Sequence, residues 1–266
     1  MKNDPIGIFD SGIGGLTIVK AIKKIMPNED IIYFGDTEHL PYGEKSNEAI
    51  QNFSKKITAF LIKKKCKAIV IACNSASSVA FEFVKTEAQN TPAFNVIDPV
   101  IKKLCDSYKK NIIGVIGTKA TIQSKIYQRK INRLCKECKV FSLATPLLAP
   151  MIEEGFINEK ISNTIINNYL SNPKIQGIDH LILACTHYPL IQNTIIKYYN
   201  NTVNVVDTSK IVAKDISSSL ITMNLSKKSA ANKDQFYVSN YTKAFEKSAQ
   251  FFLKKDLQLE QINLWT

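Results

Sequence analysis

Long apolar runs are missing from this sequence of 266 residues, and none could cross a bilayer as a helix. The first residues, Met-Lys-Asn-Asp, carry no apolar segment of the kind found in a secretory signal. The composition, 45% hydrophobic and 22% charged, is typical of a soluble globular protein. We therefore expect a cytoplasmic protein that does not bind a membrane, with its six cysteines as reduced thiols.

Arginine is also scarce. Only Arg129 and Arg133 occur, so the net charge of +12 comes from lysines spread over expected helix faces. No aromatic-interleaved basic stripe and no nucleic-acid-binding motif accompanies that charge, which argues against a nucleic-acid partner. Both arginines fall on one expected surface helix. An acidic substrate would therefore have to be held by backbone N–H groups and hydroxyls, without guanidinium groups.

Two short stretches organise the sequence, IACNS at 71–75 and LACTH at 183–187. Each is an apolar run that ends in a cysteine followed by small polar residues, the pattern of a buried strand that meets a helix. A glycine-containing apolar strand precedes each one, at 7–11 and 114–118, and the same Asn-Val-hydrophobic-Asp pattern follows each one. This repeat predicts two related halves that present equivalent cysteines to one cleft.

Short apolar strands alternate with amphipathic helices along the chain, which predicts parallel sheets with helices on both faces. The expected fold class is α/β, with two pseudo-symmetric, doubly wound domains, mainly parallel sheets and the active site in the cleft between the domains. We expect residues 1–98 and 208–266 in the first domain, with the C-terminal section packing back onto it, and residues 99–207 in the second. The expected strands cover 7–10, 31–34, 68–72, 95–97, 112–116, 139–143, 180–184, 236–239 and 259–264, and the principal helices 16–25, 50–61, 75–87, 119–134, 157–165, 211–220 and 245–253.

The six cysteines fall into three groups. Cys66 and Cys105 fit the role of small buried hydrophobic residues. Cys135 and Cys138 have the spacing of half a zinc site or of a redox pair, but no second ligand pair follows them. We interpret that segment as the end of a surface helix and expect no metal there.

Cys73 and Cys185 stand where a parallel strand ends and a helix begins, the position at which α/β sheets bind ligands. A helix N-terminus favours an anion, so we expect the pKa of a thiol there to fall from about 8.5 toward neutrality. His187, two residues after Cys185, is placed to share or relay a proton.

Two thiols that face one cleft suit the reversible inversion of a carbon centre. That reaction needs a base on one face and an acid on the other, with the roles exchanged in the reverse direction. A cysteine amidohydrolase needs one thiol and a base, and a non-catalytic amino-acid-binding protein needs no thiol, so neither alternative uses the second cysteine. Nearby carboxylates would bias the protonation of each thiol: Asp10 after the first strand, and Glu153 or Glu154 in the loop after Pro150. For Asp10, and similarly for Asp36, a loop-ordering role is an equal alternative.

No cofactor is expected. The glycine-rich turn at 11–15 lacks dinucleotide-binding spacing, and no lysine stands in a recognisable pyridoxal-phosphate setting. The groups available to bind an acidic substrate are Ser11 with the glycine turn, Tyr42 with Gly43, Asn74 with Ser75, Thr118 with Thr121, and Thr186.

Four motifs together resemble those of the bacterial glutamate racemases in the aspartate/glutamate racemase family. They are FDSGIGGLT at 9–17, PYG at 41–43, ACNSAS at 72–77 and CTHYPL at 185–190. The resemblance extends from about residue 6 to about residue 210. Ser75 stands where the family usually has threonine, which keeps the hydroxyl and removes a methyl contact.

The resemblance implies a cofactor-independent racemase that converts L-glutamate to D-glutamate for peptidoglycan synthesis, and a homodimer. It also implies that Cys73 and Cys185 move the α-proton on opposite faces, assisted by Asp10, Glu153 and His187. A related racemase that acts on aspartate is the nearest alternative. The substrate-binding residues implied by the resemblance are Ser11, Pro41, Tyr42, Gly43, Asn74, Ser75, Thr118, Thr121 and Thr186.

Overall fold

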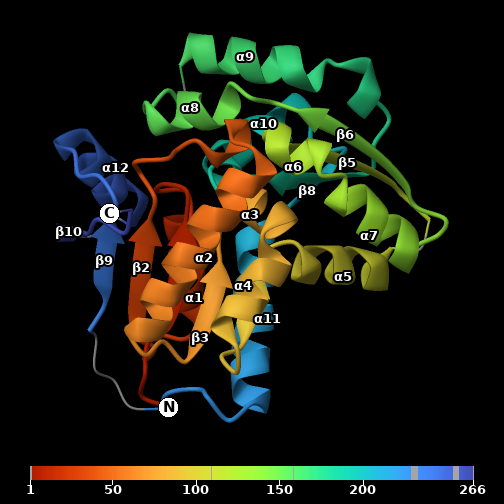
Figure 1. Cartoon of the computed structure of the whole chain (residues 1–266). Coiled ribbons are helices and arrows are strands. Elements are labelled where there is room, and N and C mark those ends of the chain that lie inside the picture. Colours follow the sequence, from red (N-terminus) through yellow and green to blue (C-terminus); the bar gives the residue numbers. More distant parts are fainter. Residues whose placement is uncertain (1, 109, 158, 229–232, 254–257, 266) are drawn as a thin grey trace.

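The computed structural model describes residues 2–108, 110–157, 159–228, 233–253 and 258–265. It contains two β-sheets flanked by helices (Figure 1), with strand orders β10-β9-β2-β1-β3-β4 and β6-β5-β7-β8. Neighbouring strands run parallel in every pair. The strands are β1 (Ile6–Asp10), β2 (Ile31–Gly35), β3 (Ala68–Ile71), β4 (Ala93–Asn95), β5 (Ile112–Gly117), β6 (Lys139–Ala144), β7 (His180–Ala184), β8 (Asn204–Val206), β9 (Gln235–Val238) and β10 (Leu259–Gln261).

The two sheets repeat one strand order. The set β2-β1-β3-β4 corresponds to β6-β5-β7-β8, and a cysteine of the repeated motif follows the third strand of each set in sequence, β3 and β7. The α/β class with two pseudo-symmetric parallel sheets is therefore confirmed. Strands β9 and β10 extend the first sheet beyond β2. The division into domains at 1–98 with 208–266 and at 99–207 stays a proposal.

Helices cover both sheets, and none within the described ranges is long and apolar enough to span a membrane. Apolar residues at helical spacing face the core in α1, where Leu16, Val19 and Ile22 are buried. The helices are α1 (Leu16–Ile25), α2 (Asn47–Lys63), α3 (Asn74–Val79), α4 (Phe81–Ala88), α5 (Asp98–Ser107), α6 (Lys119–Gln123), α7 (Ile126–Leu134), α8 (Leu148–Glu153), α9 (Lys160–Leu170), α10 (Gln192–Tyr198), α11 (Thr208–Thr222) and α12 (Lys243–Leu253), with short 3₁₀ turns η1 (Tyr42–Glu44), η2 (Pro173–Ile175) and η3 (Tyr188–Ile191).

The ends of several expected elements shift, such as the last strand, expected at 259–264 and observed as Leu259–Gln261, and three elements differ in kind or continuity. The helix expected at 75–87 is divided into α3 and α4 at Ala80, and that at 119–134 into α6 and α7 at Lys125, which has φ 54°. The apolar spacing continues across both breaks and gave no sign of them. The segment after Pro146, expected as a loop, forms the short helix α8. Its Pro150 lies in the first turn, where a missing N–H costs no helical hydrogen bond.

One hydrophobic core runs from the first sheet into the second. It includes Val70 of β3 and Ile182 of β7, and Val212 and Ile216 of α11. Helix α11 packs against α1 and also contacts β7. The two halves therefore share buried apolar surface as well as facing each other across a site.

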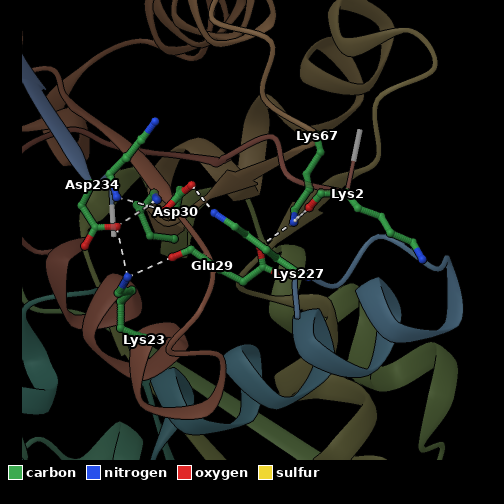
Figure 2. A network of polar contacts seen from close by, with 9 residues as sticks. Lys2, Lys23, Glu29, Asp30, Lys67, Lys227 and Asp234 are labelled. Carbon is green, nitrogen blue, oxygen red and sulfur yellow. Dashed lines mark hydrogen bonds and ion pairs between the residues drawn. The ribbon is translucent and has the colours of Figure 1, made fainter. Parts of the chain in front are cut away.

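A buried ion network lies at the amino-terminal ends of β2 and β3 in the first sheet (Figure 2). The Nζ of Lys67 lies 2.5 Å from Oε2 of Glu29, and that of Lys227 lies 2.5 Å from Oδ2 of Asp30. These four side chains are at most 9% exposed. The carboxylate of Asp234 accepts from the first backbone N–H of β2 at 3.1 Å. The network therefore fastens the chain after α11 to the start of β2.

Cys135 and Cys138 form a disulfide across the turn that follows α7. The expectation that all six cysteines are reduced is wrong for this pair, while Cys66, Cys73, Cys105 and Cys185 are free. The turn brings the two Cα atoms to 5.5 Å, which lies within the range that a disulfide bridges.

Candidate active site

The carboxyl ends of β1 and β3 meet those of β5 and β7 between the two sheets. The glycine turn after β1 touches the chain after β7, where a Cβ on Gly14 would lie 2.5 Å from Oγ1 of Thr186. Across the site, Oγ of Ser75 lies 2.8 Å from Oγ1 of Thr118. The structure therefore brings together candidate residues from both halves.

Cys73 caps the N-terminus of α3, and its Sγ accepts from the N–H of Ala76 at 3.5 Å and lies 3.7 Å from Oγ of Ser11. The residue is 5% exposed. Burial first, and then the charges of Asp10 and Cys185, raise the pKa of the Cys73 thiol to about 12. The expected fall toward neutrality is wrong for Cys73, because burial and the charge of Asp10 outweigh the opposing hydrogen bonds from Ala76 and Ser11.

On the opposite side of the site, Cys185, His187 and Glu153 form a line of contacts. The Sγ of Cys185 lies 3.5 Å from Nδ1 of His187, whose Nε2 lies 2.9 Å from Oε1 of Glu153. Burial alone would lower the pKa of His187, but the contacts with Cys185 and Glu153 raise it well above 6.5. These two contacts favour the protonated form of the imidazole. Glu153 makes this contact, whereas the neighbouring Glu154 is exposed.

Asp10 is fully buried at the end of β1. Its Oδ2 accepts from the N–H groups of Gly15 at 2.9 Å and Gly12 at 3.2 Å, and its Oδ1 accepts from the hydroxyl of Thr186 at 3.5 Å. Burial raises the pKa of Asp10, against the opposing effects of His187 and the two N–H groups. The carboxyl group of Asp10 thus orders the glycine turn, and its charge also raises the pKa of the Cys73 thiol.

A cluster of hydroxyl groups joins the two halves. Thr118 caps α6 by accepting from the N–H of Thr121 at 3.3 Å, and its Oγ1 donates to that of Thr121 at 3.1 Å. The hydroxyl of Ser75 lies within 3.4 Å of both threonine oxygens. Three rotatable O–H groups at one point can donate to an anionic oxygen.

Asn74 follows Cys73 directly, and its side chain is oriented from the other half. Its Oδ1 accepts from the hydroxyl of Tyr127, on α7, at 2.7 Å. Within the described ranges, the amide nitrogen of Asn74 has no hydrogen-bond acceptor, so its two N–H groups are available to a bound molecule.

The loop before η1 approaches the site through its backbone. Pro41 follows a cis peptide bond, and Tyr42 is 1% exposed with its hydroxyl donating to Asp36 at 2.6 Å. A Cβ on Gly43 would lie 2.6 Å from Cβ of Thr118, so only glycine allows this approach. Because the Tyr42 hydroxyl is engaged, contacts from this loop to a ligand would come from the backbone. Asp36 accepts this hydrogen bond, so its carboxylate does not take the part in the site that Asp10 takes.

Two tyrosines at the site were missed by the sequence analysis. The hydroxyl of Tyr33, on β2, donates to the carbonyl of Gly12 at 2.6 Å and so holds the turn beside Asp10. Burial, with the charges of Asp10, Cys73 and Glu153, raises its pKa well above 10. Tyr127, whose hydroxyl donates to Asn74, is the second tyrosine that was missed. Both fall on apolar patterns that indicate core aromatics, and nothing in the sequence marks their hydroxyls.

The chemistry available here is proton transfer. Two thiols stand among two carboxylates and an imidazole, and the described residues hold no group of three or more His, Cys, Asp and Glu placed to bind a metal ion. The thiol of Cys73 can donate a proton. Cys185 contacts His187, which in turn contacts Glu153.

A profile of the Asp/Glu/Hydantoin racemase family matches residues 16–216. The chain belongs to this family. It is 37% identical to glutamate racemase 3 of Caldanaerobacter subterraneus subsp. tengcongensis over 96% of this chain and 92% of that one. It is 38% identical to the glutamate racemase of Neisseria meningitidis serogroup C, over 99% of this chain and 98% of that one. Such identity over nearly full length makes it an enzyme of the glutamate racemase group, an amino-acid isomerase.

The fold of this racemase matches solved relatives closely. A crystal structure of Francisella tularensis glutamate racemase in complex with D-glutamate has a TM-score of 0.94 and 39% identity, covering 100% of this chain and 99% of that one. The aspartate racemase of Picrophilus torridus has a TM-score of 0.56 and 24% identity over 81% of this chain and 94% of that one, which supports the shared fold alone.

Proposed function

We propose that the chain interconverts L- and D-glutamate by moving the α-proton between two cysteines without a cofactor. The observation that carries this proposal is the placement of Cys73 and Cys185 after equivalent strands of two facing sheets, with different partners. A single-thiol hydrolase does not use that arrangement. The likeness to a glutamate racemase solved in complex with D-glutamate supports the choice of substrate.

The different surroundings of the two thiols support a division of labour. Cys73, with a pKa of about 12, rests as the protonated acid. Cys185 acts as the base: its thiolate takes the α-proton from one face, and Cys73 returns a proton to the opposite face. The electron pair of the broken C–H bond stays on the substrate until the new C–H bond forms. This step leaves Cys185 as the thiol and Cys73 as the thiolate, which is the state that starts the reverse reaction. Proton exchange with water restores the first state before the next forward turnover.

Charged partners stabilise the intermediate steps. Protonated His187, held by Glu153, keeps a positive charge next to Cys185 while the thiolate forms and disappears. Asp10 provides the negative charge on the Cys73 side. The carbanionic intermediate gathers charge on the α-carboxylate, so donors aimed at that group lower the barrier.

Donors for the substrate carboxylates are supplied without arginine. We assign the amide of Asn74, the hydroxyls of Ser75, Thr118, Thr121 and Thr186, and the turn at Ser11 to this task, with Pro41, Tyr42 and Gly43 contributing backbone. We further propose that the protein is a cytoplasmic homodimer. It supplies D-glutamate for peptidoglycan synthesis.

The test is circular dichroism of purified protein with either glutamate enantiomer in deuterated water, without added cofactor. We expect the optical signal to decay from both enantiomers and deuterium to enter at the α-carbon. Decay with aspartate but none with glutamate would change the substrate and keep the mechanism. No decay with either would remove the proposed function.

A further inference from the structure

The loop at 36–44 is fastened on two sides. On one side, its Gly43 packs against Thr118 of the second half. On the other side it meets the C-terminal section of the chain, which reaches it beyond β9, next to β2 in the first sheet (Figure 1). The site described above uses only the first of these contacts.

Asp36 is the centre of the second side. This fully buried carboxylate accepts from the hydroxyl of Tyr42 at 2.6 Å and from that of Ser239 at 2.8 Å, and it lies 3.0 Å from Nδ1 of His39. Ser239 follows β9, and its Oγ also accepts from the N–H of Glu38 at 2.9 Å. One serine therefore holds the loop both directly and through Asp36.

Trp265 completes the attachment. His39 stacks on Phe53 of α2 at 4.0 Å between ring centroids, and Trp265 meets the edge of the same imidazole at 4.5 Å. Phe53 contacts the ring of Tyr42 at 5.7 Å. His39 is thus enclosed by an aromatic ring on α2, a carboxylate on its own loop and the indole near the C-terminus.

We propose that Ser239 and Trp265 are positioning residues for racemisation. Neither belongs to the catalytic machinery. They act through Asp36 and His39 to hold Tyr42 and Gly43 against the second half, where the loop backbone binds substrate. This inference rests on the proposed function, because its main consequence is substrate affinity. Loss of either contact lets the loop move away from Thr118 and lowers affinity, while the thiols stay in place.

The experiment compares Ser239→Ala, Trp265→Ala and Trp265→Phe with the wild type. A matched control is Tyr237→Phe, on the strand β9 that precedes Ser239. It removes a hydroxyl bonded to Gln235 and Lys64 and leaves the loop untouched. Losing a hydrogen bond to a buried carboxylate corresponds to about a tenfold loss of affinity. We expect the KM for both glutamate enantiomers to rise about tenfold in Ser239→Ala and Trp265→Ala, with kcat within about threefold of the wild type.

Trp265→Phe should restore most of the affinity, because a smaller ring still packs on His39, and Tyr237→Phe should keep the wild-type KM even where its melting temperature falls. Unchanged KM in both alanine variants, or an equal rise in Tyr237→Phe, would overturn the proposal.

Hydrogen–deuterium exchange of residues 37–44 separates this inference from the proposed function, since it requires no turnover. We expect faster exchange there in both alanine variants, and no such change in Tyr237→Phe. If the wild type failed to racemise glutamate, this loop-specific increase would still support the attachment. Equal exchange in all proteins would contradict it.

Discussion

Gly14 and His187 approach so closely across the two sheets that a Cβ on Gly14 would lie 2.6 Å from Cε1 of the imidazole. Gly14→Ala must therefore displace His187 or the glycine turn. Because a misplacement of about 1 Å can cost about 100-fold in rate, we expect kcat to fall about that much. Gly12→Ala is the comparison, since its Cβ would meet Oε1 of Glu153 at 3.4 Å, an ordinary contact. Equal activity in the two variants would refute the steric argument.

Removing either thiol should stop racemisation. A positioned acid or base typically contributes a factor of about 10² to 10⁴, so Cys73→Ala and Cys185→Ala should each lose at least about 100-fold in turnover. Binding of glutamate, measured by calorimetry, should change little, because neither thiol is among the proposed carboxylate donors. Full turnover in either variant would exclude the two-base mechanism.

Asp10→Asn should stabilise the protein while lowering its activity. Burial raises the pKa of Asp10, so the folded protein binds this proton more tightly than the unfolded chain. The free energy of unfolding of the wild type therefore falls as pH rises from the ordinary value of 3.8 through the raised pKa. Asparagine removes that dependence. Denaturant unfolding at several pH values should show a gap that widens with pH across this window, and a constant gap would contradict the assignment.

His187 should be protonated at pH 7 and should depend on Glu153. Its raised pKa contributes stability that is fully present below pH 6.5 and lost as pH rises through the folded-state pKa. An NMR titration of the three histidines, assigned with His187→Asn, would show this. Glu153→Gln should lower the pKa of His187, and Glu154→Gln, a change at an exposed neighbour, should leave it unaltered. The reverse pattern would identify Glu154 as the partner.

Removing one charge from the ion network of Figure 2 should destabilise the protein more than removing both charges of a pair. Lys67→Met leaves Glu29 buried without this cation, and breaking such a pair typically costs about 3–5 kcal/mol in the free energy of unfolding. The double variant Lys67→Met, Glu29→Gln removes both charges and should recover part of that loss. Urea unfolding of the single and double variants measures the difference, and equal loss in both would show that the charges are not coupled.

Periodicity and strand ends predicted much of this enzyme. The apolar runs before Cys73 and Cys185 are buried strands of parallel sheets, and their repeated surroundings correspond to a repeated strand order. Such features are local, because the residues of each strand are enough to predict it. The helix breaks at Ala80 and Lys125 are not, because the apolar spacing continues through both.

The site was harder to predict where distant partners decide the chemistry. The pKa of Cys73 depends on burial and on Asp10, which lies 63 residues away along the chain, so a rule based on its helix N-terminus gave the wrong direction. Tyr33 and Tyr127 hold Gly12 and Asn74 through hydroxyls on aromatic rings that would fill a core equally well. Asp36 resembled Asp10 in its place after a strand, but its partners are the hydroxyls of Tyr42 and of the distant Ser239.

The return of β9 and β10 to the first sheet has a consequence for synthesis on the ribosome. Until residue 235 has emerged, β2 has no partner on its outer side, although all four strands of the second sheet have already been made. An unpaired strand edge can join another chain. The strands of the second sheet are therefore made before the strand that completes the first sheet, and the outer edge of β2 stays open to other chains until β9 has been made.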